Sequence, residues 1–375
     1  MADVSKLLHT TTDSDNFLEN LFADATLLRE AKAKIRAHLR KEFGRAGRDR
    51  FGQEIRPRFF TQGSSSYRTL NDPAWPPGQQ KDLDDGCYLP LSFVRGERPS
   101  RAAALFFEFV DAALGDLAEE EGWTLVRKPT CVRLEIADDA HVDVPLYAIP
   151  DREFLQLEDR ATQQARKTAT KVSPDHWEAL PSDAVLLAHR EEGWKESDPR
   201  KIHKWFIDAV DLYGECLRRD CRFLKAWRDH HHLDDLHLSS ILLMACAWTA
   251  YEAMMATALP KREDERLLSV AERLPAMLRN DMPNPACKSE NLNRMSPKER
   301  ESAATKAEEL RNRLKEAVGF CSDKRRAVDL MRLAFGERVP DRPDQVSLPV
   351  AAQASINAHP KKTVPAPVVG RSRSG

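Results

Sequence analysis

Apolar side chains recur at helical spacing in several long stretches of the chain. Residues 13–44 carry such a pattern, which predicts one long helix with Asp13 or Ser14 as its cap. A second helix is predicted over residues 100–121, with Ser100 as its cap. Beyond Pro199 the same spacing predicts that the chain is helical near 199–229, 236–258, 263–279, 297–318 and 322–335.

Shorter apolar or alternating runs predict strands in the first half of the chain. These runs lie near 59–60, 83–93, 130–136 and 140–149. Helices and strands therefore interleave over the first 150 residues, whereas helices alone follow residue 199. This order predicts an α/β lobe followed by a helical lobe.

The composition is typical of a soluble globular protein and does not indicate one that binds nucleic acid over a large basic surface. Apolar residues make up 41% and charged residues 31% of the 375 positions, enough to build a buried core. Lys and Arg number 58 against 59 Asp and Glu. The chain therefore has no excess of positive side chains of the kind that binds the phosphate backbone of nucleic acids. We therefore expect no stable nucleic-acid partner, although small anionic substrates remain compatible with this balance.

Cysteine usage and hydropathy indicate a cytoplasmic protein. The seven cysteines include no CxxC pair, which is typical of reduced thiols rather than a disulfide framework or zinc ribbon. The N-terminus lacks the apolar run of a signal peptide. The most apolar stretch, 238–259, contains Tyr251 and Glu252, so it is interpreted as a buried core helix, and no membrane association is expected.

Two aspartates form the centre of the predicted site. Asp82 and Asp84 are two positions apart in a predicted strand, so their carboxylates leave the same face of the sheet. Two adjacent carboxylates repel one another unless a cation lies between them, and their hard oxygen ligands suit Mg²⁺. Asp85 points to the opposite face and is interpreted as structural.

Asp143 is the candidate third ligand. It interrupts an otherwise apolar strand, HVDVPLYAI. If this strand pairs beside that of Asp82, three carboxylates converge and can hold two Mg²⁺ ions. One ion would lower the pKa of an attacking hydroxyl and the other would neutralise a leaving pyrophosphate.

A glycine–serine turn precedes these aspartates. Gly63 allows a close backbone approach, and the N–H groups at the start of a following helix attract phosphate. Ser64 and Ser66 supply hydroxyl donors. A Gly-Ser turn or a DxD pair alone is usually only a turn or a solvated acidic patch, but the two together with a later strand aspartate predict a nucleotidyltransferase.

The motifs also resemble a known family. QGSSSYRTLNDPAWPPGQQKDLDDGCYLPL, HVDVPLYAIP, SDPRKIHKWF and RFLKAWRDHHHLDDLHLSSILLMACAW are similar to segments of the bacterial cGAS/DncV-like nucleotidyltransferases, in particular the DncV-like cyclic GMP-AMP synthases. The resemblance covers roughly residues 14–335. It implies a two-lobed, polymerase-β-like α/β fold, with a mixed-sheet lobe and a helical C-terminal lobe. It also implies ATP and GTP as substrates, a cyclic dinucleotide second messenger as product, and a part in antiphage defence (CBASS).

The resemblance implies a role for individual residues. It assigns catalysis and metal binding to Asp82, Asp84 and Asp143. It assigns nucleotide contacts to Gln62, Gly63, Ser64, Ser65, Ser66, Tyr67, Arg133, Ser197, Lys225, Ser239 and, as a candidate for base selection, Asp281. Without the resemblance, Lys225 is interpreted as extending toward solvent and Ser239 as a helix cap.

The expected organisation is a lobe over 1–195, a helical lobe over 196–336 and a disordered tail over 337–375. The tail is rich in proline and poor in large apolar residues. Many relatives of this family resemble ubiquitin in ending on a flexible segment with a terminal glycine, as this chain does at Gly375. The resemblance implies that a ubiquitin-activating-like enzyme conjugates this end to a target. The alternative is a dispensable disordered end.

Two rival functions remain at this stage. A template-free RNA nucleotidyltransferase would make linear products. Such an enzyme would need a basic groove to hold the RNA strand, and the formal charge of −1 makes this alternative less attractive. An inactive nucleotide-binding scaffold would have no use for three ligand carboxylates. The cluster His230, His231 and His232 is interpreted as a helix end, because consecutive helical side chains diverge.

Overall fold

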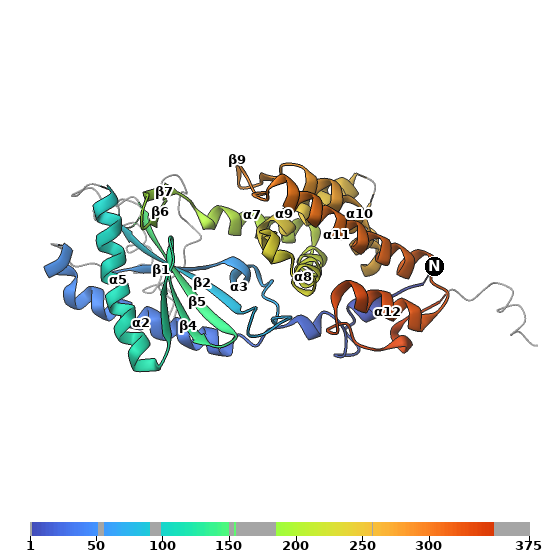
Figure 1. Cartoon of the computed structure of the whole chain (residues 1–375), viewed down its shortest axis with the longest axis horizontal. Coiled ribbons are helices and arrows are strands. Elements are labelled where there is room, and N and C mark those ends of the chain that lie inside the picture. The colour runs from blue at the N-terminus through green and yellow to red at the C-terminus, as the bar shows by residue number, and fades with distance from the viewer. Residues whose placement is uncertain are drawn as a thin grey trace, which may run out of the picture.

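The computed structural model describes residues 2–51, 56–90, 99–149, 154, 185–256 and 258–348. These residues form two lobes side by side, with the sheet in one and a helical array in the other (Figure 1). No helix in these ranges combines the length and the apolar character needed to cross a bilayer.

The first lobe is built on a mixed sheet. Five strands are paired in the order β1 (Arg58–Gln62), β2 (Lys81–Pro90), β5 (Ala140–Ile149), β4 (Cys131–Ala137) and β3 (Thr124–Arg127). A hairpin of β6 (Leu186–His189) and β7 (Gly193–Glu196) joins β5. Strands β2 and β5 are parallel, whereas the other pairs in this sheet are antiparallel.

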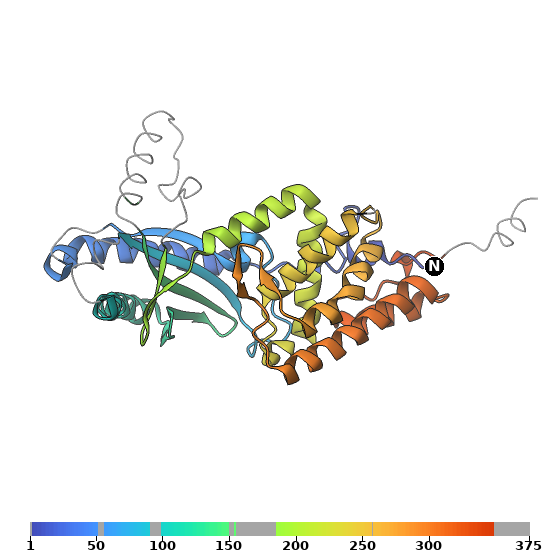
Figure 2. The same ribbon diagram turned by 90° about the horizontal axis from the view of Figure 1, so that it is seen from above.

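Two long helices cover one face of this sheet (Figures 1 and 2). They are α2 (Thr26–Phe51) and α5 (Pro99–Glu121). Leu83, Val142 and Val144 point into the core beneath these helices, since alternate residues of a strand share a face. The opposite face is therefore left to the polar residues of β2 and β5.

The second lobe packs six longer helices and the short helix α1 (Ser5–Leu8) around a separate core. The six longer helices are α7 (Pro199–Tyr213), α8 (Glu215–His230), α9 (Ser240–Met255), α10 (Glu263–Arg279), α11 (Pro297–Lys315) and α12 (Lys324–Phe335), accompanied by a hairpin of β8 (Pro283–Asn284) and β9 (Cys287–Asn291). The helix predicted over 199–229 is divided at Gly214, whose φ of 85° ends α7. Few residues other than glycine adopt this backbone conformation without strain.

The N-terminal segment departs from the sequence prediction. The helix begins at Thr26 instead of near Asp13, and apolar residues that precede it, among them Phe17 and Leu21, lie in the core of the helical lobe. Phe17 is fully buried there and stacks on Phe223 with ring centroids 5.2 Å apart. The helical spacing of Phe17 and Leu21 therefore reflects burial in the second lobe and not a continuation of α2.

The predicted start of the tail at residue 337 falls inside the packed structure of the helical lobe. Val339 and Val346 are fully buried, and Ser347 exchanges two backbone hydrogen bonds with Asp3 at 2.8 and 3.0 Å. Residues 337–348 belong to the helical lobe, because these valines pack on its core. The remaining tail, including Gly375, lies outside the described residues.

Asp85 provides a test of how the lobe is held together. It is fully buried on the face covered by α2, where Arg36 donates two hydrogen bonds at 2.6 and 2.7 Å. Asp85→Ala would remove the buried carboxylate that accepts both of these bonds from the largely buried guanidinium, so we expect a loss of about 3–5 kcal/mol in the free energy of unfolding. Glu121→Ala is the control, because its partner Lys34 is half exposed and the loss should stay below about 1 kcal/mol. Urea unfolding of both variants measures the difference, and equal losses would contradict a structural role for Asp85.

Candidate active site

Four polar side chains form an array on the open face of the sheet. In the parallel pair β2–β5, Asp82 lies opposite His141 and Asp84 lies opposite Asp143. Residues two apart on a strand share a face, so all four side chains point the same way. The predicted convergence of Asp82, Asp84 and Asp143 is therefore present.

Arg133 extends this array onto the next strand. It lies opposite Asp143 in the β4–β5 register and donates hydrogen bonds to both carboxylate oxygens at 2.7 and 2.8 Å. The pairing raises the pKa of Arg133, so the guanidinium stays charged. It offsets part of the negative charge that gathers at this point.

Crowding and burial disfavour the charged forms of the two β2 carboxylates. Burial and the charge of Asp143 raise the pKa of Asp82 to about 6. Burial, followed by the charges of Asp82 and Asp143, raises the pKa of Asp84 well above its ordinary value. Carboxylates in this situation are stabilised by a nearby cation.

The glycine–serine segment lies directly against Asp84. Gly63 starts the short helix α3 (Gly63–Tyr67) with a φ of 66°. A Cβ at position 63 would fall well inside van der Waals contact of Asp84 Oδ2. Position 63 thus excludes a side chain both by its backbone conformation and by its contact with the carboxylate.

The neighbours of Gly63 have different surroundings. Gly63, Ser64 and Tyr67 line a cleft, whereas Ser66 Oγ lies 3.0 Å from His203 Nδ1. Gln62 is buried and donates to the Tyr147 hydroxyl at 3.1 Å. Ser65 belongs to the same short helix.

The cleft between the lobes measures about 980 Å³ and contains most of the predicted nucleotide-contact positions. Arg133 lines the cleft on the side of the sheet. Ser197, just before α7, and Lys225 and Ser239 of the helical lobe also line it. Ser239 also caps α9, since its side chain accepts a hydrogen bond from the Leu242 N–H. Both interpretations of Ser239, helix cap and cleft residue, are compatible with this position.

Lys225 does not extend toward solvent. It is 5% exposed, and its Nζ donates to the Thr69 carbonyl oxygen at 2.6 Å. Burial, followed by the charge of Arg228, lowers the pKa of Lys225 to about 8. The ammonium is still mostly charged at neutral pH and acts on Asp82 across the cleft.

Asp281 lies away from this cleft. Its side chain is 73% exposed and pairs with Arg300 at 2.9 Å. The acidic residue that β9 contributes to the cleft lining is Glu290, and Arg294 follows it. The sequence analysis did not point to Glu290, because it did not predict the β8–β9 hairpin that presents this residue.

His141 is a further site residue that the sequence prediction missed. It precedes Asp143 by two positions, the same spacing that identified Asp82 and Asp84, so the strand pattern could have revealed it. Ligand atoms of Asp82, His141 and Asp143 all lie within 4.8 Å of one another. Asp82 Oδ1 and His141 Nε2 are buried and have no hydrogen-bond partner among the described residues, so the donor set fits a divalent cation.

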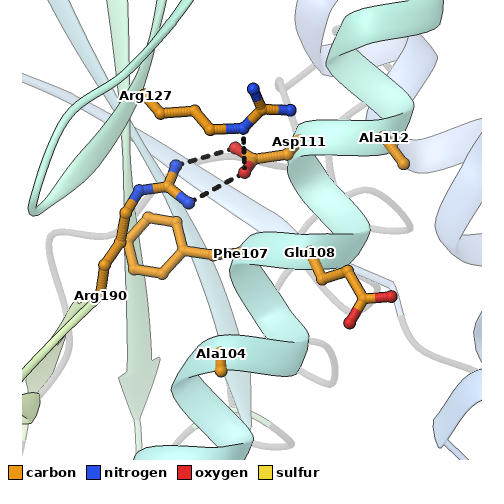
Figure 3. A pocket seen from close by; sticks show the side chains of 7 residues that line it. All are labelled: Ala104, Phe107, Glu108, Asp111, Ala112, Arg127 and Arg190. Carbon is orange, nitrogen blue, oxygen red and sulfur yellow. Dashed lines mark hydrogen bonds and ion pairs between the residues drawn. The ribbon is translucent and has the colours of Figure 1, made fainter.

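A second cavity, of about 470 Å³, lies outside the cleft on α5 and has a different character. Figure 3 shows Asp111 facing both Arg127 and Arg190 there. Arg190 donates to the two Asp111 oxygens at 2.9 and 2.8 Å, and Arg127 donates at 2.9 Å. Two guanidiniums share one carboxylate here, so these three side chains keep a net charge of +1, which Glu108 on the same lining balances. The cavity lining therefore lacks the concentrated negative charge found in the cleft.

Comparisons with known proteins agree with this architecture. A family model for the nucleotidyltransferase domain of DncV-like cyclic GMP-AMP synthases matches residues 57–147. A second model, for the C-terminal domain of cyclic GMP-AMP synthase, matches residues 214–347. A cyclic GMP-AMP synthase of Vibrio cholerae is 35% identical over 305 residues, which are 76% of this chain and 68% of that protein. One of Escherichia coli is 40% identical over 188 residues, which are 47% of this chain and 43% of that protein.

Solved structures show the same fold. Vibrio cholerae DncV, described as a cyclic AMP-GMP synthase and prokaryotic cGAS homolog, matches with a TM-score of 0.74 and 27% identity over 94% of this chain and 100% of that chain. The same protein in complex with the linear intermediate 5′ pppA(3′,5′)pG matches with a TM-score of 0.74 and 28% identity over 92% and 98% of the two chains. The predicted two-lobed fold class is confirmed.

Gly63 allows a sharp test of the site's geometry. Gly63→Ala places a methyl group against the Asp84 carboxylate and should displace it enough to lower turnover about 100-fold. Gly115→Ala is the control, because its methyl group would meet no atom of the described chain within 4 Å and should leave turnover unchanged. Steady-state rates and thermal unfolding of both variants are measured together. Normal turnover in a folded Gly63→Ala protein would contradict the assigned contact.

Proposed function

The chain belongs to the DncV-like family of cyclic GMP-AMP synthases and is a nucleotidyltransferase. From this premise we propose that it joins ATP and GTP into cyclic GMP-AMP with the help of Mg²⁺. The observation that carries the proposal is the array of Asp82, Asp84 and Asp143 on one face of the sheet, where Asp82 and Asp84 line the interlobe cleft. Relatives and solved structures described as cyclic GMP-AMP synthases support the choice of product.

The three aspartates hold the proposed metal site. Parallel pairing fixes Asp84 beside Asp143, and Asp82 follows on the same face. Two divalent ions bound there would lower the pKa of an attacking ribose hydroxyl and neutralise charge on the leaving pyrophosphate. Arg133 keeps Asp143 oriented through its two hydrogen bonds.

The triphosphate is proposed to lie between α3 and Lys225. Among the described residues no side chain caps the start of α3, so its first backbone N–H groups are available to phosphate oxygens. Lys225 uses one donor on Thr69, and the ammonium has further donors for the phosphates. Ser64 lies next to this position and supplies a hydroxyl. The lobes thus contact one substrate from two sides.

One site is proposed to make both phosphodiester bonds. The linear intermediate must turn over and present its other end to the same carboxylates. The DncV complex with a linear pppA(3′,5′)pG intermediate supports this order for that relative. A template-free polymerase making linear products is the alternative.

The biological role is proposed from the resemblance to the family. The product would serve as a second messenger in antiphage defence, inside the cytoplasm. A ubiquitin-activating-like enzyme is proposed to conjugate Gly375, which lies outside the described residues. Truncation of the last residues should abolish covalent adducts in cells and leave synthesis by the purified enzyme intact.

Removal of the carboxylates tests the metal site. The double variant Asp82→Asn, Asp84→Asn keeps the shape of both side chains but cannot neutralise a divalent ion. We expect turnover to fall at least about 1,000-fold while the melting temperature holds or rises, because the repulsion is relieved. Pyrophosphate release and thermal unfolding are the measurements. Asp208→Asn, at an exposed carboxylate on α7, should keep full turnover; near-normal release from the double variant would refute the site.

The product itself is tested by incubating the protein with all four nucleoside triphosphates and Mg²⁺. Mass spectrometry should find cyclic GMP-AMP as the main product. ATP alone or GTP alone should support less turnover than the two together. Linear oligonucleotides without a cyclic species would favour the template-free polymerase.

A further inference from the structure

His141 presents an unused lone pair to the metal site. The amide of Gln80 donates through Nε2 to the Asp138 carbonyl oxygen at 3.1 Å, so its other atom, Oε1, faces His141 Nδ1 at 2.8 Å. A carbonyl oxygen only accepts hydrogen bonds, and Nδ1 therefore carries the proton. The second ring nitrogen, Nε2, is left as an acceptor.

This acceptor faces another acceptor. His141 Nε2 lies 3.5 Å from Asp82 Oδ1, and neither atom has a hydrogen-bond partner within the described part of the chain. His141 is 6% exposed, so water does not solvate most of the ring. Two buried lone pairs that face each other require a positive species between them.

We propose that His141 is a nitrogen ligand of one of the divalent cations held by Asp82 and Asp143. The inference rests on the proposed metal-dependent function and extends its donor set. An ion about 2.1 Å from a nitrogen and an oxygen ligand can bridge atoms 3.5 Å apart in cis positions. The Asp143 carboxylate has about four lone-pair sites, so the two hydrogen bonds from Arg133 leave room for the ion.

The surrounding charge favours an ion over a shared proton. Asp84 and Asp143 add negative charge beside Asp82, and a divalent ion neutralises more of it than a proton does. The Gln80 hydrogen bond orients the ring, as the outer partner of a ligating histidine usually does.

A nitrogen ligand alters the preference among metals. Mg²⁺ prefers oxygen ligands, whereas affinity for a mixed nitrogen and oxygen site rises from Mn²⁺ to Co²⁺ and beyond. Removal of His141 should therefore weaken the binding of Mn²⁺ and Co²⁺ more than that of Mg²⁺.

The test is electron paramagnetic resonance of Mn²⁺ bound to the full chain. Protein labelled with ¹⁵N-histidine is mixed with Mn²⁺ and a non-hydrolysable ATP analogue. Pulsed spectra should show ¹⁵N coupling to the manganese. His141→Asn retains a donor near the Nδ1 position for Gln80 and removes Nε2, so the coupling should vanish and Mn²⁺ affinity should fall about 10-fold. Mg²⁺ affinity by calorimetry should change less than the Mn²⁺ affinity.

His189→Asn is the matched control. His189 is 8% exposed and belongs to β6 of the same lobe, and this variant should retain the ¹⁵N coupling. Manganese that binds the wild-type carboxylates without ¹⁵N coupling would overturn the role of His141 and leave the proposed metal site standing. Failure of Mn²⁺ and Mg²⁺ to bind the wild-type protein at all would overturn both.

Discussion

The parallel pairing of β2 with β5 is the constraint on which the site depends. It places Asp84 opposite Asp143 and Asp82 opposite His141, although the two strands are far apart in the sequence. The register is fixed from the other face, where Leu83 and the valines of β5 are buried under α2 and α5. A shift by one residue would turn the carboxylates of one strand into that apolar core.

This arrangement concentrates charge that the fold must then counter. Burial and mutual repulsion raise the pKa values of Asp82 and Asp84. Arg133 supplies a positive group from β4, and Lys225 supplies another from the helical lobe. Neither removes the repulsion, so a divalent ion would still be favoured between the carboxylates. The positive charge of Lys225 in the helical lobe thus attracts the carboxylate of Asp82 in the sheet lobe, at the place where substrate is proposed to bind.

The sequence identified site residues where a local rule was sufficient. The spacing of Asp82 and Asp84 within one strand predicted their shared face, and the apolar surroundings of Asp143 revealed its unusual position. His141 obeys the same rule, but a histidine in a strand is a weaker signal than a carboxylate. Asp281 was assigned to base selection without such a rule, and the structure places it at the surface.

The sequence by itself determined the division into an α/β part followed by a helical part, the apolar face of β2 and β5 and the carboxylate ligands, because these follow from side-chain spacing and type. Only the tertiary structure decided which segments pack together. Phe17 and Val346 show helical or tail-like local patterns, yet both are buried in the helical lobe. The burial of Lys225 against Thr69 likewise depends on a contact between lobes. Such choices are set by non-local packing, since the gain from burying apolar surface depends on partners that local sequence does not specify.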